Sequence, residues 1–412
     1  MVVVTGTNGK TTVSNLLAEA LKGEGLRVAS NRYGSNLAAG VATALIDAVG
    51  WTGRSRADIA VIEMAERSAR LHPARPRADL LVCMNLARDS IKRNAHPAYI
   101  AWIISSALAE QTSLVLNADD LIASSLGGDA NPRSHFAVDR LPTDGDRPSG
   151  AAVDVAICPV CDHRLEWEYW RFNHVGKAYC PACGFRAPEA AYRAREIDAA
   201  GGRLTIDLDG EERSARLIND NIVNVYNEVA VAAVLDRLGV SRDRIVAAFE
   251  TPRAACHPVR ARGHRRLATR APADEGARRR PACSRAFQYL ASFPGRKVAV
   301  LNIDEATERE NEVENTAWTY DADYEYLADD SLGQIVVGGV RRYDQALTAR
   351  DRRRRPGPDR HHVLETAAAD LVDLDGAASV FNLHSVHNAP QHRNARAATT
   401  TGPTRERNRA AS

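Results

Sequence analysis

The sequence predicts an α/β fold built on a mostly parallel sheet. Short β-branched and leucine-rich runs alternate with helix-forming stretches from residue 2 to about residue 125, and strand-forming runs return after residue 287. Strands that alternate with helices favour βαβ units and parallel pairing. The runs expected as strands are 2–4, 59–62, 80–84, 114–116, 203–209, 298–303 and 335–337, and those expected as helices are 11–23, 36–49, 98–110 and 219–237.

The length of the chain indicates more than one domain, because 412 residues exceed what a single hydrophobic core usually holds. We expect an α/β domain over residues 1–250, interrupted by a small inserted module at residues 154–190. A smaller domain is expected at residues 251–388, and residues 389–412 have the composition of a disordered tail.

Composition excludes some classes of protein. The apolar fraction of 44% is that of an ordinary globular protein, and the net charge of +2 gives no argument for nucleic-acid binding. No apolar run is long enough to cross a bilayer, and the N-terminus starts on a strand-like run rather than a signal peptide. A cytoplasmic location is therefore the expectation.

Two stretches of the chain are rich in arginine. Residues 251–280 hold nine Arg against two acidic residues, and Arg residues become frequent again from Arg350. Solvated loops, a basic patch for an anionic substrate or partner, and a translated frameshift would each produce this composition. We place no site residues in these stretches.

The N-terminal loop has the composition of a phosphate-binding loop. It spans Thr5–Thr12 and lies between a hydrophobic strand and a helix. Gly6 and Gly9 allow a tight turn that brings backbone N–H groups up to phosphate oxygens, and the following helix presents its positive end. Lys10 is spaced to reach the β- and γ-phosphates, and the Thr11 hydroxyl is spaced to hold magnesium.

This loop is shorter than the strict P-loop, which would need glycine in place of Val4. A glycine-rich turn with a chance lysine is the alternative, and the strand–loop–helix context disfavours it. The form G-T-x-G-K-T resembles the ATP loop of the Mur ligases and folylpolyglutamate synthases, which join an amine to a carboxylate through an acyl phosphate. The resemblance implies ATP contacts from Gly6, Thr7, Asn8, Gly9, Lys10, Thr11, Thr12 and Asn227.

Other motifs of the same family follow in order. Glu63 ends a strand where such ligases carry a magnesium-binding glutamate, so the resemblance implies Lys10 and Glu63 as catalytic residues and Thr11 and Glu63 as magnesium ligands. Asn85 ends the next strand, Asn117–Asp120 follows a later one, and Asn224–Asn227 resembles the family's N-x-x-N element. Each motif alone is weak, because Asn at a strand end is usually a turn or cap residue.

Two C-x-x-C pairs, separated by 18 residues, indicate a zinc ribbon. Four thiolates fill a tetrahedral shell, so the zinc is expected to be structural. Aromatic residues between the pairs could stack on nucleic-acid bases, but we expect them to form the core of the module. The expected zinc ligands are Cys158, Cys161, Cys180 and Cys183, and the interleaved aromatic residues are Trp167, Tyr169, Trp170, Phe172 and Tyr179. The unpaired Cys83 is expected to be a core residue.

A ribbon at this point narrows the resemblance to the MurT branch of the Mur ligases, which also implies a Rossmann-like C-terminal domain. The branch pattern D-x-S-W-x-[WY]-D matches at Trp318, Tyr320 and Asp321, for which we expect ordinary core packing of the two aromatic residues. Its first aspartate, which supports the partner's Cys–His pair, falls on Asn315, so the acidic role would pass to Glu314 or Glu312 or be lost.

Two further motifs of the branch are altered. The aspartate of its E-[IV]-D-E element is replaced by Ala65, and its R-D-Q-x-D-R stretch is matched at Arg88, Asp89 and Arg93.

The resemblance implies ATP-dependent amidation of the D-glutamate α-carboxylate in lipid II. The sequence shows no glutaminase signature, so ammonia would come from a GatD-like glutamine amidotransferase partner. Three alternatives remain: a stand-alone amino-acid ligase of the Mur or folylpolyglutamate type, a non-catalytic protein that uses its zinc ribbon for binding, and a degraded gene product.

Overall fold

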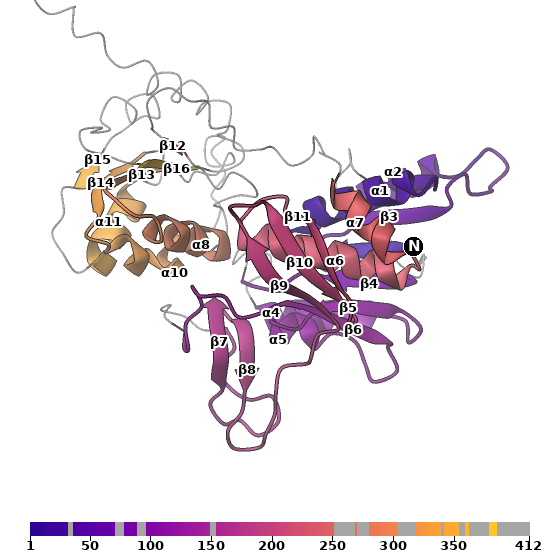
Figure 1. Ribbon diagram of the computed structural model, residues 1–412, viewed down its shortest axis with the longest axis horizontal. Coiled ribbons are helices and arrows are strands. Elements are labelled where there is room, and N and C mark those ends of the chain that lie inside the picture. Colours follow the sequence, from indigo (N-terminus) through magenta and orange to yellow (C-terminus); the bar gives the residue numbers. More distant parts are fainter. Residues whose placement is uncertain are drawn as a thin grey trace, which may run out of the picture. The chain divides into compact units, whose positions relative to one another are not determined.

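The computed structural model describes residues 1–31, 36–70, 78–88, 96–148, 154–250, 268–269, 280–302, 318–338, 342–353, 359–361 and 379–384. The described residues divide into two compact units (Figure 1). Those up to residue 250 belong to the first unit, and those from residue 268 belong to the second. Expected features on Asp89, Arg93, Glu312, Glu314 and Asn315, and in residues 389–412, lie outside the described residues.

A nine-stranded sheet with the order β11-β10-β9-β6-β5-β4-β1-β3-β2 organises the first unit. Neighbouring strands from β2 to β9 in this order pair in parallel, and β10 pairs antiparallel with both β9 and β11. The strands are β1 (Val2–Thr5), β2 (Val28–Ser30), β3 (Ile59–Glu63), β4 (Leu80–Cys83), β5 (Ser113–Asn117), β6 (Arg133–Val138), β9 (Tyr192–Asp198), β10 (Arg203–Leu208) and β11 (Glu212–Arg216).

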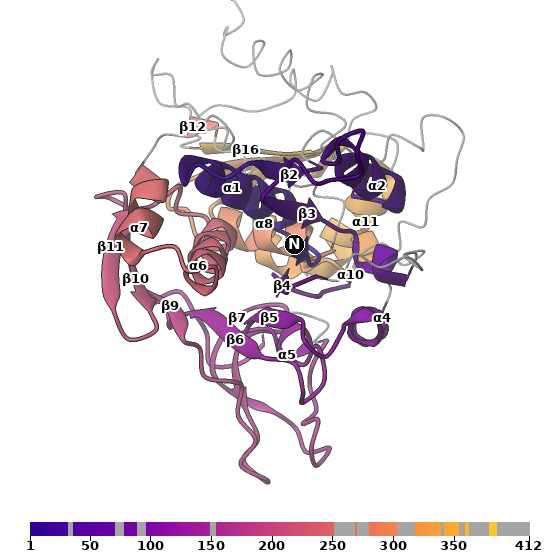
Figure 2. The same cartoon turned by 90° about the vertical axis from the view of Figure 1, so that its right-hand side faces the viewer.

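Helices cover both faces of this sheet, because its central strands are apolar on both sides. Val2 and Val4 pack with α1 and α6, whereas the intervening Val3 packs with α4 and α5 on the opposite face (Figure 2). The helices of the unit are α1 (Lys10–Gly23), α2 (Ala38–Asp47), η1 (Glu66–Arg70), α4 (Pro97–Ala107), α5 (Leu121–Ser124), α6 (Ile222–Arg237) and α7 (Arg242–Glu250).

The parallel direction of the central strands places their C-terminal ends along one edge of the sheet. The loops after β1, β3, β4 and β5 start at this edge, where open α/β sheets usually bind their ligands. These strand ends and the loops after them carry the phosphate-loop motif, Glu63, Asn85 and Asn117–Asp120.

A separate hairpin lies between β6 and β9 in the chain. Its strands β7 (Glu166–Phe172) and β8 (Val175–Tyr179) form a two-stranded antiparallel ladder, and isolated bridges link Trp170 to Gly145 and Val175 to Asp120 (Figure 1). The two cysteine pairs flank this hairpin at the end opposite its turn.

The second unit has a five-stranded parallel sheet with the order β12-β16-β13-β14-β15. Phe287, Tyr324 and Phe381 lie in the buried core that joins its helices to the sheet. The elements are β12 (Ala268–Thr269), α8 (Arg280–Ala291), β13 (Lys297–Asn302), α10 (Trp318–Asp321), η2 (Tyr324–Leu327), β14 (Leu332–Val337), α11 (Arg342–Arg353), β15 (Asp359–His361) and β16 (Ser379–His384).

The predicted α/β class is confirmed. Each strand and helix expected from the sequence is present, with ends that differ by three residues or fewer. Among the described residues, no helix combines the length and apolar character needed to cross a membrane.

Candidate active site

The phosphate loop is fixed by close backbone approaches that only glycine permits. Gly6 has φ +127°, and a Cβ there would lie 3.0 Å from the backbone nitrogen of Met84 and the backbone oxygen of Asn85. Gly9 has φ +90°, and a Cβ there would lie 2.3 Å from Asn227 Oδ1. Both glycines therefore allow loops from distant parts of the sequence to meet at the strand edge.

Asn85 holds the loop from the neighbouring strand end. The backbone nitrogen of Thr7 donates to the Asn85 carbonyl oxygen at 2.7 Å, and that of Asn8 donates to Asn85 Oδ1 at 3.0 Å. Helix α1 then begins at Lys10, and its N-cap residue, Gly9, has no side chain to cap it. The first N–H groups of a helix lack intrahelical acceptors, so this end can receive an anion.

Lys10 lies buried against its own loop. Its Nζ donates to the Gly6 carbonyl oxygen and lies 3.4 Å from that of Thr7 and 3.5 Å from Glu66 Oε1. Glu66 is the last residue of the Glu63–Glu66 element and is itself buried. The ammonium group is thus already at the phosphate loop and pairs with a carboxylate there.

Thr11 and Glu63 come together as the magnesium hypothesis requires. Thr11 Oγ1 donates to Glu63 Oε1 at 3.1 Å, and Asn36 Nδ2 donates to the same oxygen at 3.3 Å. A hydroxyl and a carboxylate are hard oxygen ligands of the kind Mg²⁺ takes beside nucleotide phosphates. The donor set therefore fits this ion.

Asn227, on α6, lies beside Gly9 at the same edge of the sheet. Its Oδ1 faces Gly9, is buried and has no hydrogen-bond partner among the described residues, while its Nδ2 donates to Asn224 Oδ1 at 3.1 Å. A buried acceptor without a partner costs free energy unless a ligand satisfies it. This orphaned oxygen supports a ligand position above the loop.

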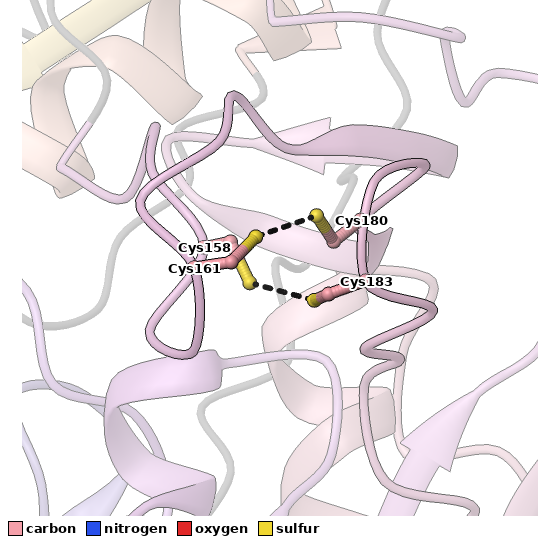
Figure 3. Close-up of side chains that lie close together, drawn as sticks. All are labelled: Cys158, Cys161, Cys180 and Cys183. Atoms are coloured by element: carbon pink, nitrogen blue, oxygen red, sulfur yellow. Dashed lines mark hydrogen bonds between the residues drawn. The ribbon is translucent and has the colours of Figure 1, made fainter.

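The four cysteines form one cluster (Figure 3). The Sγ atoms of Cys158 and Cys183 lie 3.6 Å apart, those of Cys161 and Cys180 lie 3.5 Å apart, and all four lie within 4.8 Å of one another. Zinc with Zn–S bonds of about 2.3 Å in a tetrahedron separates sulfurs by about 3.8 Å. The thiolate set fits a structural zinc ion with no open position.

The two knuckles repeat the same backbone path. The backbone nitrogens of Asp162 and Gly184 donate to the carbonyl oxygens of Cys158 and Cys180, both at 3.1 Å. Both residues have positive φ, at 58° for Asp162 and 77° for Gly184. Glycine adopts this conformation without strain and aspartate tolerates it, which explains the residue that follows each C-x-x-C pair.

The expectation that the ribbon aromatics form a core is confirmed for Trp167, Tyr169 and Trp170, which are buried, whereas Phe172 and Tyr179 are only partly buried. Trp167 and Trp170 are buried in one cluster with Cys158 and Cys180. Cys83 is also buried, and burial raises the pKa of its thiol. The prediction that Tyr320 packs in a core is wrong: its side chain is 42% exposed, and its hydroxyl donates to Asp344 Oδ1 at 2.7 Å, because the short α10 turns this side chain outward.

Sequence reasoning missed a cluster of buried polar residues at the turn between β7 and β8. Arg171 Nη2 donates to Asp144 Oδ2 at 2.7 Å, and Arg171 Nη1 lies 3.3 Å from Asp119 Oδ2. Near it, His174 Nε2 lies 3.1 Å from Asp120 Oδ1, and Nδ1 lies 3.7 Å from Asp154 Oδ2. The one signal in the sequence was the polar stretch Arg-Phe-Asn-His between two runs rich in aromatic residues.

The two carboxylates keep His174 protonated. Burial opposes its charge, but the attraction of Asp120 and Asp154 outweighs burial and raises the pKa of His174 to about 10. Arg88 Nε lies 2.5 Å from Asp154 Oδ1, so this carboxylate is shared between two cations. Arg88, which matches the family motif, therefore pairs with the first described residue of the inserted module.

Comparison with known proteins relates this chain to one group of ligases. Residues 4–138 match the family model of the Mur ligase middle domain. The chain is 27% identical, over 83% of its length and 75% of the relative, to the Staphylococcus aureus (strain COL) protein named lipid II isoglutaminyl synthase (glutamine-hydrolyzing) subunit MurT. The Streptococcus pneumoniae protein of that name is 26% identical over 85% of this chain and 76% of the relative.

The fold has a counterpart among solved structures. A pseudomurein peptide ligase type C from Methanothermus fervidus superposes with a TM-score of 0.68 at 20% identity, over 96% of this chain and 78% of that chain. The domain match and the named relatives support an ATP-dependent ligase of the Mur type, and the solved structure has the same fold. Within that class, the names of the relatives support a MurT-type Mur ligase.

We expect the purified protein to hold about one zinc ion per chain, because four thiolates complete one tetrahedral site. Elemental analysis of the protein and of the double variant Cys161→Ser/Cys183→Ser measures this. The double variant should lose the metal, and Cys83→Ser, which lies outside the cluster, should retain it. A folded, cooperative wild-type protein free of zinc would contradict the ribbon assignment.

The charged His174 should stabilise the fold in a pH-dependent way. Because its pKa rises from 6.5 to about 10 on folding, its contribution is fully present below pH 6.5 and is lost as pH rises towards 10. Chemical unfolding of wild type and His174→Gln should therefore give a stability difference that shrinks from about pH 6 to about pH 9. A difference independent of pH would show that His174 acts without its charge.

Proposed function

We propose that this chain uses ATP to activate the α-carboxylate of the D-glutamate residue in lipid II and then transfers the acyl group to ammonia. The observation that most supports this is the convergence of Lys10, Asn227 and the Thr11–Glu63 pair at one strand edge. The names of the relatives supply the substrate class, since those proteins are lipid II isoglutaminyl synthase subunits.

The reaction has two steps. A carboxylate oxygen attacks the γ-phosphorus, and the bond to the β,γ-bridging oxygen breaks, so ADP leaves with that electron pair. Ammonia then attacks the acyl carbon and the carbon–oxygen bond to phosphate breaks. Phosphate leaves with the electron pair and takes up one proton from nitrogen, which gives a neutral amide.

The protein contributes position and charge in both steps. The Lys10 ammonium turns from Gly6 and Glu66 to the terminal phosphates, and the N–H groups at the start of α1 stabilise the charge that develops there. Thr11 and Glu63 would hold magnesium, which would neutralise negative charge on the phosphates. Asn227 offers its orphaned oxygen to the nucleotide.

Ammonia comes from a GatD-like glutamine amidotransferase that forms a heterodimer with this chain. The subunit designation of the named relatives supports such a partner. The reaction takes place in the cytoplasm at the membrane surface, where the lipid-linked substrate is accessible.

Lys10→Ala should lower ATP-dependent turnover by at least about 100-fold, because one preorganised donor to a developing charge contributes roughly 10²–10³ in rate. Phosphate release in the presence of lipid II and an ammonia source measures this. Lys22→Ala is the matched control, since Lys22 is an exposed lysine of the same helix that pairs with Glu19. Turnover by a cooperatively folded Lys10→Ala protein within a few fold of wild type would remove Lys10 from the mechanism.

Co-expression with a GatD-like protein should yield a stable heterodimer that amidates lipid II with glutamine as nitrogen donor. The chain alone should use ammonium but not glutamine, and mass spectrometry of the lipid product distinguishes the two. Failure to form a complex with any such partner, together with ATP turnover that depends on an amino acid, would instead favour a stand-alone ligase.

A further inference from the structure

The turn of the zinc-ribbon hairpin is buried in the ATP-binding unit. Arg171 is 4% exposed, Asn173 is 8% exposed and His174 is fully buried, although all three lie at or beside the turn between β7 and β8. Hairpin turns usually lie at the surface, since their backbone groups need water or other partners. Here polar and charged partners of the unit replace that water.

One set of contacts runs from the hairpin to α6 and the phosphate loop. Asp119 Oδ2 accepts a hydrogen bond from Tyr226 OH at 2.5 Å and lies 3.3 Å from Arg171 Nη1, which also donates to the Tyr226 hydroxyl. Asp119 Oδ1 accepts from the hydroxyl of Tyr169 on β7 at 2.8 Å. Burial raises the pKa of Tyr226 well above its usual value, so this phenol stays neutral and donates.

The position of Tyr226 matters because its neighbour in the helix is Asn227. Asn227 Oδ1 is the atom that a side chain at Gly9 would meet at 2.3 Å. A shift in the position of Tyr226 would therefore move Asn227, the adjacent residue of α6, against Gly9 of the phosphate loop.

A second set of contacts runs from the hairpin turn to the loop after β4. His174 Nε2 lies 3.1 Å from Asp120 Oδ1, and Asp120 Oδ2 accepts from the backbone nitrogen of Leu86 at 2.8 Å. Leu86 follows Asn85, whose backbone and side-chain oxygens hold the phosphate loop at Thr7 and Asn8. Asp120 thus connects the hairpin turn to the residue that fixes the loop.

The other end of the same hairpin is the cysteine cluster. Cys180 directly follows β8, and Cys158 and Cys180 share a buried cluster with Trp167 and Trp170 of β7. A strand of this length spans about 17 Å, so one short, paired ladder joins the thiolates to the buried turn. No other regular element of the described residues lies between them in the chain.

We propose that zinc binding at the cysteine cluster and nucleotide binding at the phosphate loop are coupled, with Tyr226 and His174 as positioning residues. The inference rests on the nucleotide-binding part of the proposed function. Zinc fixes the hairpin, and the hairpin turn holds Asp119 and Asp120, which in turn set the positions of Asn227 and Asn85. By linkage, bound nucleotide must increase zinc affinity by the same factor by which zinc increases nucleotide affinity.

The test uses the full-length, zinc-loaded protein. Binding of a fluorescent ADP analogue with magnesium is titrated in wild type, Tyr226→Phe and His174→Gln, with zinc content measured on each sample. Tyr226→Phe removes a single oxygen atom and keeps the ring, so it disturbs the first set of contacts with little loss of packing. Lys177→Ala is the control on the same hairpin, since Lys177 pairs with Glu168 and Glu189 rather than with the buried turn.

We expect each positioning variant to retain zinc and to bind nucleotide roughly five- to tenfold more weakly, and Lys177→Ala to stay within twofold of wild type. In the reciprocal experiment, competition with a chelator measures zinc affinity with and without magnesium–ADP. Nucleotide should raise zinc affinity in wild type and raise it less in Tyr226→Phe.

Two results would overturn the coupling while the proposed function stands: zinc affinity indifferent to nucleotide, or wild-type nucleotide affinity in both folded variants. A wild-type protein that binds zinc but no nucleotide would overturn the coupling and the proposed function together.

Discussion

The pair of buried carboxylates after β5 is the constraint on which the rest of the first unit depends. Asp119 is 2% exposed and Asp120 is fully buried. A buried carboxylate is costly unless cations and hydrogen-bond donors surround it. Asp120 accepts from the backbone nitrogens of Leu86, Ile122 and Ala123, and Asp119 accepts from that of Val138, so two side chains hold the loop after β4, the start of α5 and the end of β6.

The cations that balance these carboxylates come from the inserted hairpin. Arg171 and His174 both lie between the two cysteine pairs in the sequence. The buried carboxylates of Asp119 and Asp120 therefore have their cationic partners only when the insertion is in place. Removing one partner of a buried pair usually costs more than the pair itself contributes, because a bare charge remains. The zinc ribbon is therefore part of the folded ATP-binding unit rather than an appendage on its surface.

How far the sequence predicts this molecule depends on whether a feature is local. The phosphate loop and the cysteine knuckles were recognisable because a few adjacent residues determine each geometry, such as Gly9 before α1 or Gly184 after Cys183. Asp119 and Asp120 were noticed only as polar residues at a strand end. Their partners lie 50 or more residues away, at Arg171, His174 and Tyr226, and no spacing rule connects positions so distant.

Tyr320 illustrates a different limit of sequence reasoning. An aromatic residue in a family motif was expected to pack in a core, yet its hydroxyl pairs with Asp344 at the surface of the second unit. Burial of a side chain depends on which face of its helix meets the sheet. A helix of four residues makes only about one turn, so its sequence shows no apolar periodicity that would identify that face. Short strands are equally difficult: the three-residue β2 was not expected at all.

The two candidate metal sites differ in donor chemistry, so they select different ions. The Thr11–Glu63 pair offers only hard oxygen atoms and keeps Thr11 exposed, which suits an ion that arrives and leaves with each nucleotide. The cysteine cluster offers only soft thiolates, and two of its four members are buried. Soft ligands in a closed tetrahedron retain zinc, whereas magnesium does not compete for them. An ion that stays bound at the cysteine cluster can hold the hairpin in place through every turnover. An exchangeable ion at Thr11 and Glu63 can bind and leave together with the nucleotide.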